Sequence, residues 1–462
     1  MKRGNIMPNN YDSYVAMLNA IRNEASQRYS NAIPAADGTV ENLKTIGAQL
    51  TSNQAFANEW LDALYNRIAI TRVLTMDAWK NPLREFKRKL EYGESYLEVA
   101  MHLNSVYTRD YEEAKTRIFD IYTPAVDSAI YHVNSEFFYP CSVLPAELRK
   151  AFLSYEALSQ FVEQIINNVY RTMEYDEYNA MLYCVLVAIN NGMPAVEIPA
   201  VSSANAREIV TRIKAASNEM EFLSTDKNIS GVPVYAGKED QYIFLNTQMD
   251  SIVDVDVLAV SFNMTRADFL GHRRLFSNFG KLDRDRLDVL FQNDPLYTRP
   301  TDAQMAQFAQ IPAFLISSGF FVAFDQYTEM FTNENGAGPY RNYFLHCGRI
   351  YSYSNFAPGV YFVPGVQSIT SVAIDPTTAA MIKNDIATFK ANVVAVNLAD
   401  PRVVWSVPDE DEAALVSLDP IDGQTVSVRL LDTLGVGESV TLRATSVFDN
   451  TKYAEATITP GA

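Results

Sequence analysis

The sequence contains few of the residues on which metal sites and disulfides depend. Among 462 residues there are 3 cysteines and 4 histidines. No two histidines stand three or four positions apart and none lies beside a cysteine motif, so no zinc-binding spacing occurs. They are His102, His132, His272 and His346. The cysteines lie far apart, which predicts buried free thiols in a reducing compartment. They are Cys141, Cys184 and Cys347. We therefore expect neither a metal ion nor a cofactor.

Long apolar runs are also missing. The longest apolar-rich stretch, Ile311 to Phe324, is interrupted by Ser317-Ser318-Gly319. It is shorter than the roughly 20 residues that span a bilayer. No apolar stretch follows Lys2 and Arg3, so the N-terminus does not resemble a secretory signal. We therefore expect no membrane partner and a protein that stays in the cytoplasm where it is made.

Positive charge is scarce. The sequence has 38 Lys+Arg against 55 Asp+Glu, a formal net charge of −17. Because phosphate contacts depend on clustered basic charge, this balance disfavours a free nucleic-acid binder. A hydrophobic fraction of 48%, with 26 Tyr and 25 Phe, excludes intrinsic disorder. At about 100 to 200 residues per domain, the length predicts two or three domains.

Recognisable catalytic motifs are absent as well. No Gly-x-Ser-x-Gly, His-Glu-x-x-His or cysteine–histidine nucleophile signature occurs. Asp254 and Asp256 could form the metal-binding pair of a sugar-nucleotide enzyme, but their apolar setting is more typical of a strand running into an acid-capped helix. Gly336-Ala-Gly338 lacks the further glycine and the helix of a phosphate loop, so it indicates a turn. We therefore expect no enzymatic activity.

The sequence contains a long region with both helix and strand patterns, and this region is followed by a segment of short strands. Residues 1 to about 60 are polar and mixed, which is more typical of an arm than of a core. Turn signals within residues 77–122 predict a projecting hairpin of extended strands. Between Ser154 and Met173, apolar residues at spacings of three and four predict an amphipathic helix of about 30 Å. A second helix, from Tyr175 to Asn190, is apolar nearly all round and should be buried.

Near Gly365 the pattern changes to short alternating strands separated by turns. Val403, Trp405 and Val407 alternate with their neighbours, as do Val440 and Leu442. Strands at roughly ten-residue spacing, over about 95 residues, predict a small β-sandwich. Its expected core residues include Phe389, Trp405 and Leu442.

Two basic clusters stand out in a sequence that is acidic overall. The first lies within the predicted hairpin and the second follows residue 272. Either can be a solvated face, or it can pair with acidic patches on copies of the same chain and so fix their register. Under the second interpretation the candidates for contact between subunits are Arg84, Lys87, Arg88, Lys89, Arg273 and Arg274.

Several stretches, in their order along the chain, resemble one family. They are Asn81–Lys87, Phe161–Tyr178, Asp254–Gly271, Asn342–His346, Asn355–Ala357, Ile369–Pro376, Val403–Val407 and Thr445–Lys452. The chain resembles the major capsid protein of small short-tailed bacteriophages of Gram-positive hosts (podovirus type, Picovirinae-like), with a C-terminal bacterial Ig-like domain of group 2.

The resemblance implies an α+β fold, the tailed-bacteriophage capsid (Johnson) fold, over residues 1–366 and an all-β Ig-like sandwich over residues 367–462. Within the capsid part it implies four segments. They are an N-terminal arm of residues 1 to about 75, an extended loop of about 80–125, a spine helix of about 154–173 and an axial domain of about 192–335.

The resemblance also implies a structural role in the virion. Copies would assemble in the host cytoplasm, as pentamers and hexamers, into an icosahedral or prolate head shell around double-stranded DNA. A separate scaffolding protein and a portal are the implied partners, and the DNA would be contacted weakly. The Ig-like domain would face outward, where it could contact the host surface. The basic residues Lys87, Arg88 and Lys89 would form a tip that meets an acidic surface of a neighbour.

Two other interpretations stay open on the residues alone. A bacterial surface adhesin would explain the Ig-like tail, but it needs a secretion signal and an anchor, and neither end of the chain supplies one. An enzyme with an Ig-like appendage would need a catalytic constellation, which the sequence lacks. Closed shells in electron micrographs would distinguish the capsid protein from both.

Overall fold

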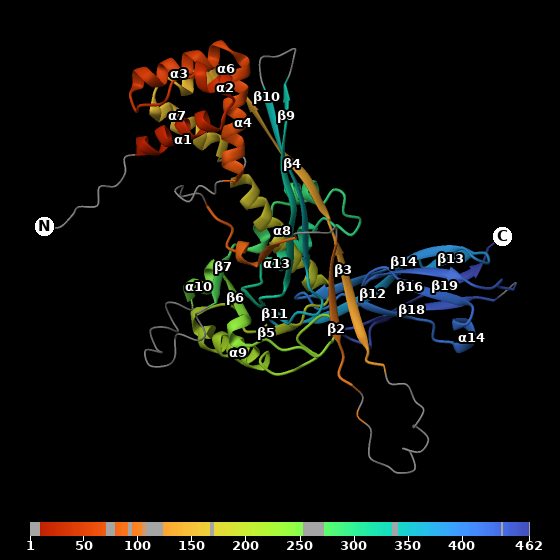
Figure 1. Ribbon diagram of the computed structural model, residues 1–462. Helices are drawn as coiled ribbons and strands as arrows, with labels where there is room; N and C mark the ends of the chain where they lie inside the picture. Colours follow the sequence, from red (N-terminus) through yellow and green to blue (C-terminus); the bar gives the residue numbers. More distant parts are fainter. Residues whose placement is uncertain are drawn as a thin grey trace.

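Helices from the beginning of the chain form a unit with two helices from further along (Figure 1). This computed structural model describes residues 10–70, 79–90, 95–104, 106, 123–166, 171–252, 272–334, 341–435 and 438–461. The six helices of this helical unit are α1 (Asn10–Glu24), α2 (Gln27–Ala32), α3 (Val40–Ser52), α4 (Gln54–Ile70), α6 (Pro145–Ala151) and α7 (Tyr155–Ile166).

The helical unit has an apolar core of its own. In α3, Leu43, Ile46 and Leu50 recur at spacings of three and four and are buried. Trp60 of α4 packs against Phe152 with 5.1 Å between ring centroids. The expectation that this segment contributes little core is therefore wrong for these helices, whereas its role as an arm stays a prediction. Their apolar residues are diluted by polar ones along the sequence, but they gather on single helix faces that pack together. Residues 1–9 lie outside the described residues.

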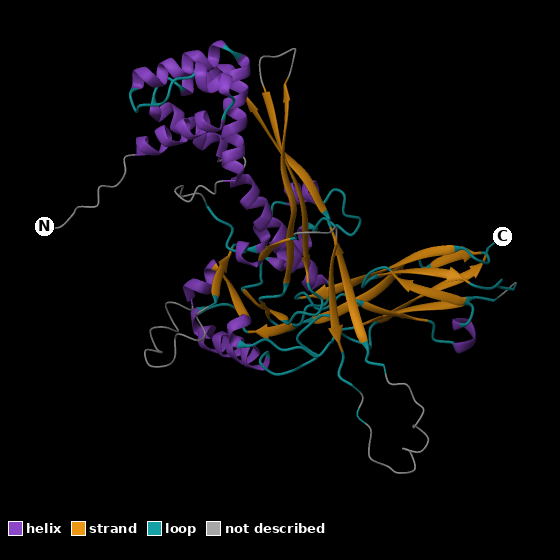
Figure 2. Cartoon of the chain, viewed as in Figure 1, coloured by secondary structure: helices purple, strands orange, loops and turns teal. Residues whose placement is uncertain are grey.

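A long sheet and a buried helix form the middle of the molecule (Figure 2). The sheet has the order β1-β9-β10-β4. Its strands are β1 (Lys87–Lys89), β4 (Ser135–Val143), β9 (Phe321–Glu334) and β10 (Arg341–Tyr353). Helix α8 (Thr172–Asn190) packs along β10 and is buried on nearly all sides, as the sequence predicts. The helix predicted over 154–173 is α7 in the helical unit, so the long helix through the middle of the molecule is α8.

A second sheet, with the order β5-β11-β8-β6-β7, forms a compact part beside α8. Its strands are β5 (Ala195–Ile198), β6 (Gln241–Asn246), β7 (Arg273–Phe276), β8 (Ala313–Ser317) and β11 (Gly359–Pro364). Helices α9 (Ala206–Glu219) and α10 (Thr247–Ile252) pack on this sheet, whereas α12 (Arg284–Leu290) packs on α8 and β4, and α13 (Asp302–Phe308) adds Phe308 to the core between them. The expected axial range of 192–335 differs from this part at its end, because β9 belongs to the long sheet and β11 to this one.

The predicted hairpin is present, but it is shifted along the chain. Strand β2 (Ser95–Met101) pairs antiparallel with β3 (Val126–His132), and the pair projects from the body (Figure 1). Exposure alternates strictly along both strands. The inward face packs on the long sheet, where the rings of Tyr96 and Phe324 lie 4.6 Å apart. Residues 107–122, which fall in the predicted extended loop, lie outside the described residues.

The C-terminal region forms a β-sandwich, as the alternation predicts. One sheet has the order β12-β14-β17-β16 and the other β13-β19-β18-β15. The strands are β12 (Ser368–Asp375), β13 (Thr378–Met381), β14 (Ile386–Val396), β15 (Val403–Ser406), β16 (Val416–Pro420), β17 (Thr425–Leu430), β18 (Val440–Ser446) and β19 (Tyr453–Pro460). Between β15 and β16 lies the short helix α14 (Glu410–Ala413). Phe389 and Leu442 are fully buried, and the half-buried Trp405 packs against the same core. That the sandwich is Ig-like stays a prediction.

Candidate subunit-contact surfaces

Three acidic side chains are buried at the start of α8. They are Glu174, Asp176 and Glu177, in a helix whose later residues are apolar. A buried carboxylate is costly unless cations and hydrogen-bond donors surround it. Each of the three has a cationic partner from another element. These acids therefore connect α8 to the segments around it.

Four charges form the centre of this network, which we call the four-charge cluster: Lys87, Glu177, Asp325 and Arg349. Oε1 of Glu177 accepts from Lys87 Nζ and from Arg349 Nη1, each at 2.6 Å. Lys87 Nζ and Arg349 Nε also lie 2.8 and 3.1 Å from the carboxylate of Asp325. The side chains of Glu177 and Arg349 are each 1% exposed. Two cations and two anions thus join β1, α8, β9 and β10 in a neutral cluster.

The remaining pairs account for three more of the six predicted contact residues. Arg84 pairs with Glu174, and Arg273 pairs with Asp250. The guanidinium of Arg274 donates two hydrogen bonds to Glu85, at 2.6 and 2.9 Å. With Lys87 in the four-charge cluster, four of the six candidates have partners within the chain. For Arg84 and Lys87, the signal in the sequence is the group of three acids at the start of an otherwise apolar helix.

Arg88 and Lys89 differ from the other candidates because both are exposed. The guanidinium of Arg88 lies over the ring of Phe324 at 5.6 Å from its centroid. Both residues belong to β1, which pairs in parallel with β9, so they lie at the foot of the hairpin and not at its tip. The predicted basic tip is therefore misplaced, because the strand that carries it is part of the long sheet. We call residues 79–90 the hairpin foot.

The outward face of the hairpin is apolar. Leu97 lies opposite Ile130 and Met101 opposite Val126, with Val99 between them. Leu97, Val99 and Ile130 are 55, 54 and 59% exposed. Within the described residues nothing covers this outward face. The period-two pattern Leu-x-Val-x-Met was visible in the sequence, but without the strand pairing its solvent-exposed side could not be assigned.

A second exposed apolar surface lies on the long sheet, and we call it the aromatic face. Phe331 lies opposite Phe344 in the adjacent strand, and Phe138 lies opposite His346. Ring centroids of Phe138 and Phe344 are 5.6 Å apart, and those of Phe331 and His346 are 5.1 Å apart. Phe138 and Phe331 are 51 and 53% exposed. The other side of the same strands packs against the helical unit. Exposed patches of this kind mark interaction sites.

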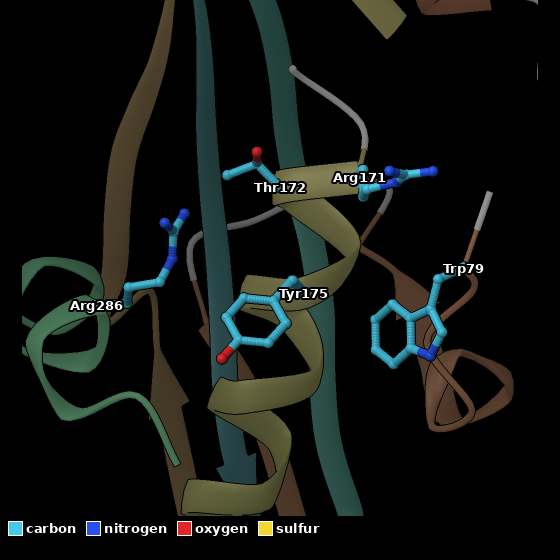
Figure 3. Close-up of a pocket in the computed structure, with 5 residues that line it drawn as sticks. All are labelled: Trp79, Arg171, Thr172, Tyr175 and Arg286. Atoms are coloured by element: carbon cyan, nitrogen blue, oxygen red, sulfur yellow. The ribbon is translucent and has the colours of Figure 1, made fainter. Parts of the chain in front are cut away.

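An open groove of about 360 Å³ lies at the first turns of α8 (Figure 3). Tyr175 and Arg171 belong to the start of α8, with Trp79 and Arg286 on either side. The guanidinium of Arg286 is held by Asp176, with 2.8 Å between Nη2 and Oδ2. Among the described residues, the lining of this groove includes no carboxylate, histidine or thiol that could act as base or nucleophile. The groove therefore suits a packing contact better than catalysis.

The cysteines are buried and free. Burial raises the pKa of the Cys184 and Cys347 thiols above their ordinary range, so both stay protonated at neutral pH. Among the described residues, no three His, Cys, Asp or Glu side chains are arranged to hold a metal ion. None of the described helices is long and apolar enough to cross a membrane.

Comparisons with solved structures find phage capsids. One match is the capsid of Staphylococcus phage Andhra, with 13% identity, a TM-score of 0.47, and 64% of this chain and 87% of that chain covered. Another is the capsid of the Helicobacter pylori bacteriophage KHP30, with 12% identity, a TM-score of 0.41, and 63% and 93% covered.

Sequence comparisons find the same class of protein. The chain is 28% identical over 398 residues to the major capsid protein of Bacillus phage PZA, covering 85% of this chain and 82% of that one. It is 28% identical over 291 residues to the major capsid protein of Streptococcus phage Cp-1, covering 58% of this chain and 77% of that one. The family model for Phi29-like phage major capsid proteins matches residues 18–363. Because that match spans most of the sequence and includes the long sheet, α8 and the hairpin, the chain belongs to the family of Phi29-like phage major capsid proteins, and it is a major capsid protein of the virion.

Proposed function

We propose that copies of this chain are joined into a shell by the outward face of the hairpin, which packs on the aromatic face of a neighbouring copy. The observation that carries the proposal is the presence of two exposed apolar β-surfaces on one chain. Burial of apolar area is the main driving force of protein association. A contact between two different surfaces continues from copy to copy, as a closed shell requires.

The two surfaces cannot meet within one chain. The inward face of the hairpin already packs against Phe324 and Val322 of its own long sheet. The hairpin projects from one end of the body, whereas Phe331 and Phe344 lie towards the far end of β9 and β10 (Figure 1). The outward face is therefore turned away from its own aromatic face, and only another copy can bring the two together.

Charge substitution on the hairpin tests the proposal. We expect Ile130→Asp to leave the free subunit folded, because Ile130 is 59% exposed, and to prevent closed shells in negative-stain micrographs. Ile386→Asp is a matched control, since Ile386 is also a strand isoleucine and also 59% exposed, but lies on the sandwich. Normal shells from Ile130→Asp, or equal loss from both variants, would rule out the contact.

A cross-link identifies the receiving surface. We expect Ile130→Cys together with Phe344→Cys to give covalent oligomers under mild oxidation, but only after assembly. The three natural cysteines are buried, so they do not interfere. Shells that form without any cross-link between copies would place the hairpin on a different surface.

We also propose roles for the other parts of the chain and name further partners. Helix α8, in place of the expected range of about 154–173, acts as the spine. The five-stranded sheet with its helices acts as the axial domain, and the sandwich over residues 367–462 is Ig-like and faces outward. A separate scaffolding protein, a portal, weak contact with the enclosed DNA and host-surface contact through the sandwich follow from the family resemblance. We propose no catalytic activity, and an adhesin role is not favoured. Shell formation from purified subunits, with and without a scaffolding protein, tests these partners.

A further inference from the structure

The loop between β14 and β15 belongs to the sandwich in sequence but is buried in the body of the molecule. We call residues 397–402 the root segment. Leu398 and Ala399 are 7 and 1% exposed. The side chain of Leu398 belongs to the apolar core that also contains Tyr361 and Val363 of β11 and residues of α8. The root segment thus contributes a core residue to the body.

Hydrogen bonds hold the root segment to the body. The Tyr361 hydroxyl donates to the carbonyl oxygen of Leu398 at 2.7 Å. Nε2 of Gln367 donates to the Tyr361 hydroxyl oxygen at 3.0 Å and to the Leu398 carbonyl at 2.9 Å. Nδ2 of Asn397 donates to the carbonyl of Val366 at 2.8 Å. Because Tyr361 and Gln367 are buried, losing one member would leave the others without partners.

Arg402 fills the space between the two parts. Asp400 holds its guanidinium, with 2.7 Å between Nη2 and Oδ2. A Cβ at Gly192, just after α8, would overlap this guanidinium, and a Cβ at Gly423 of the sandwich would lie 2.6 Å from Arg402 Cγ. Side chains at these two glycines would therefore push Arg402 out. The cation also lies at the C-terminal end of α8, where the helix dipole favours positive charge.

Two residues of the root segment have a left-handed backbone conformation, which is unfavourable unless surrounding contacts stabilise it. Asn397 and Leu398 have φ values of 52° and 57°, although neither is a glycine. Such conformations persist only where the surroundings impose them. The contacts with β11 and Gln367 supply those surroundings.

We propose that the root segment docks the sandwich rigidly on the body and completes the core of the body, so that the sandwich stabilises the capsid fold instead of hanging from it as a detachable appendage. The docking site is formed by Tyr361 and Gly192 of the body, and its occupant is the root segment of the same chain, which Gln367 at the start of the sandwich joins to Tyr361. This role does not depend on the proposed contact between subunits, and it can be measured in the unassembled chain.

Hydrogen exchange followed by mass spectrometry tests the proposal on the full chain. We expect Leu398→Ala to speed amide exchange in β11 and at the end of α8 by about tenfold or more, because it opens a cavity in the body's core. Val394→Ala, at a 54% exposed position on β14, is the control and should leave exchange unchanged. Faster exchange confined to the sandwich strands would overturn the proposal, because the root segment would then support the sandwich alone.

A double-mutant cycle provides a second readout. Gly192→Ala should lower the unfolding temperature more in the natural background than in an Arg402→Ala background, because the overlap with the guanidinium disappears in the latter. The backbone strain at Gly192, where φ is 88°, is the same in both backgrounds and cancels. Additive effects of the two substitutions would show that the sandwich and the end of α8 are not in contact, and would overturn the proposal.

Discussion

The hairpin foot and the hairpin differ in which side chains they bury: the foot buries a charged side chain, and the hairpin exposes apolar ones. The foot is rich in charge, yet its Lys87 is almost fully buried against Glu177 and Asp325. The hairpin has an apolar row, yet Leu97 and Ile130 are more than half exposed. In the foot, Arg84 and Lys87 pair with acids of the same chain, whereas the apolar row of the hairpin is left exposed. This inversion suggests that ion pairs fix the direction of the hairpin and that apolar burial joins it to another copy.

The largest effect should come from breaking the four-charge cluster. Glu177→Ala leaves Lys87 and Arg349 buried with only Asp325 between them. Removing one member of a buried ion pair costs about 3–5 kcal/mol. Urea unfolding of the free subunit measures the loss. The control is Glu85→Ala, whose partner Arg274 is partly exposed and whose loss should cost at most about 1 kcal/mol. Equal effects from both would mean that the cluster does not hold the foot.

Arg88 and Lys89, which are exposed, can be tested separately from the buried Lys87. We expect Arg88→Glu with Lys89→Glu to change subunit stability by no more than about 1 kcal/mol, because both residues are exposed and the contact of Arg88 with the Phe324 ring contributes at most about that much. If they contact an acidic surface on a neighbour, the subunit concentration needed for shells should rise about tenfold or more. Light scattering during assembly measures that concentration. Unchanged assembly would assign both residues to a solvated face.

The effect of salt on assembly distinguishes an apolar contact between copies from a charged one. If the hairpin joins copies by apolar burial, sulfate should lower the subunit concentration needed for assembly, because it strengthens apolar contacts. Moderate sodium chloride should have a smaller effect, since it mainly screens exposed charges. A titration of each salt, again followed by light scattering, provides the measurement. Assembly that weakens steeply with sodium chloride would favour a contact made by charge.

The smallest effect concerns the cysteines. Burial raises the pKa of the Cys184 and Cys347 thiols, so the reactive thiolate is scarce in the folded chain at pH 8. We expect negligible alkylation by iodoacetamide in native buffer and complete alkylation in urea, measured by mass spectrometry. Rapid labelling of Cys347 in the folded chain would show that β10 opens readily.

Periodic patterns in the sequence determined much of this protein. The buried helix over 175–190 and the C-terminal sandwich were both predictable, because a spacing of two or of three to four residues specifies which side chains share a face. The family was indicated separately, by stretches of sequence that resemble phage capsid proteins. The ion-pair partners of individual side chains were not predictable in the same way. Arg84 and Lys87 find Glu174 and Glu177 across about 90 positions, a distance over which local spacing carries no information.

The packing of the N-terminal helices, the partners of the basic residues and the burial of the root segment all depend on contacts between distant parts of the chain. The polar N-terminal segment became a packed helical unit, because its scattered apolar residues meet those of α6 and α7. The predicted contact residues were divided into buried pairs and exposed cations, because strand β1 joined the long sheet. The root segment entered the body's core only because β11 and α8 lie beside it in space. A sequence specifies which faces need partners, but the partner is chosen by the packing of segments far apart in the chain.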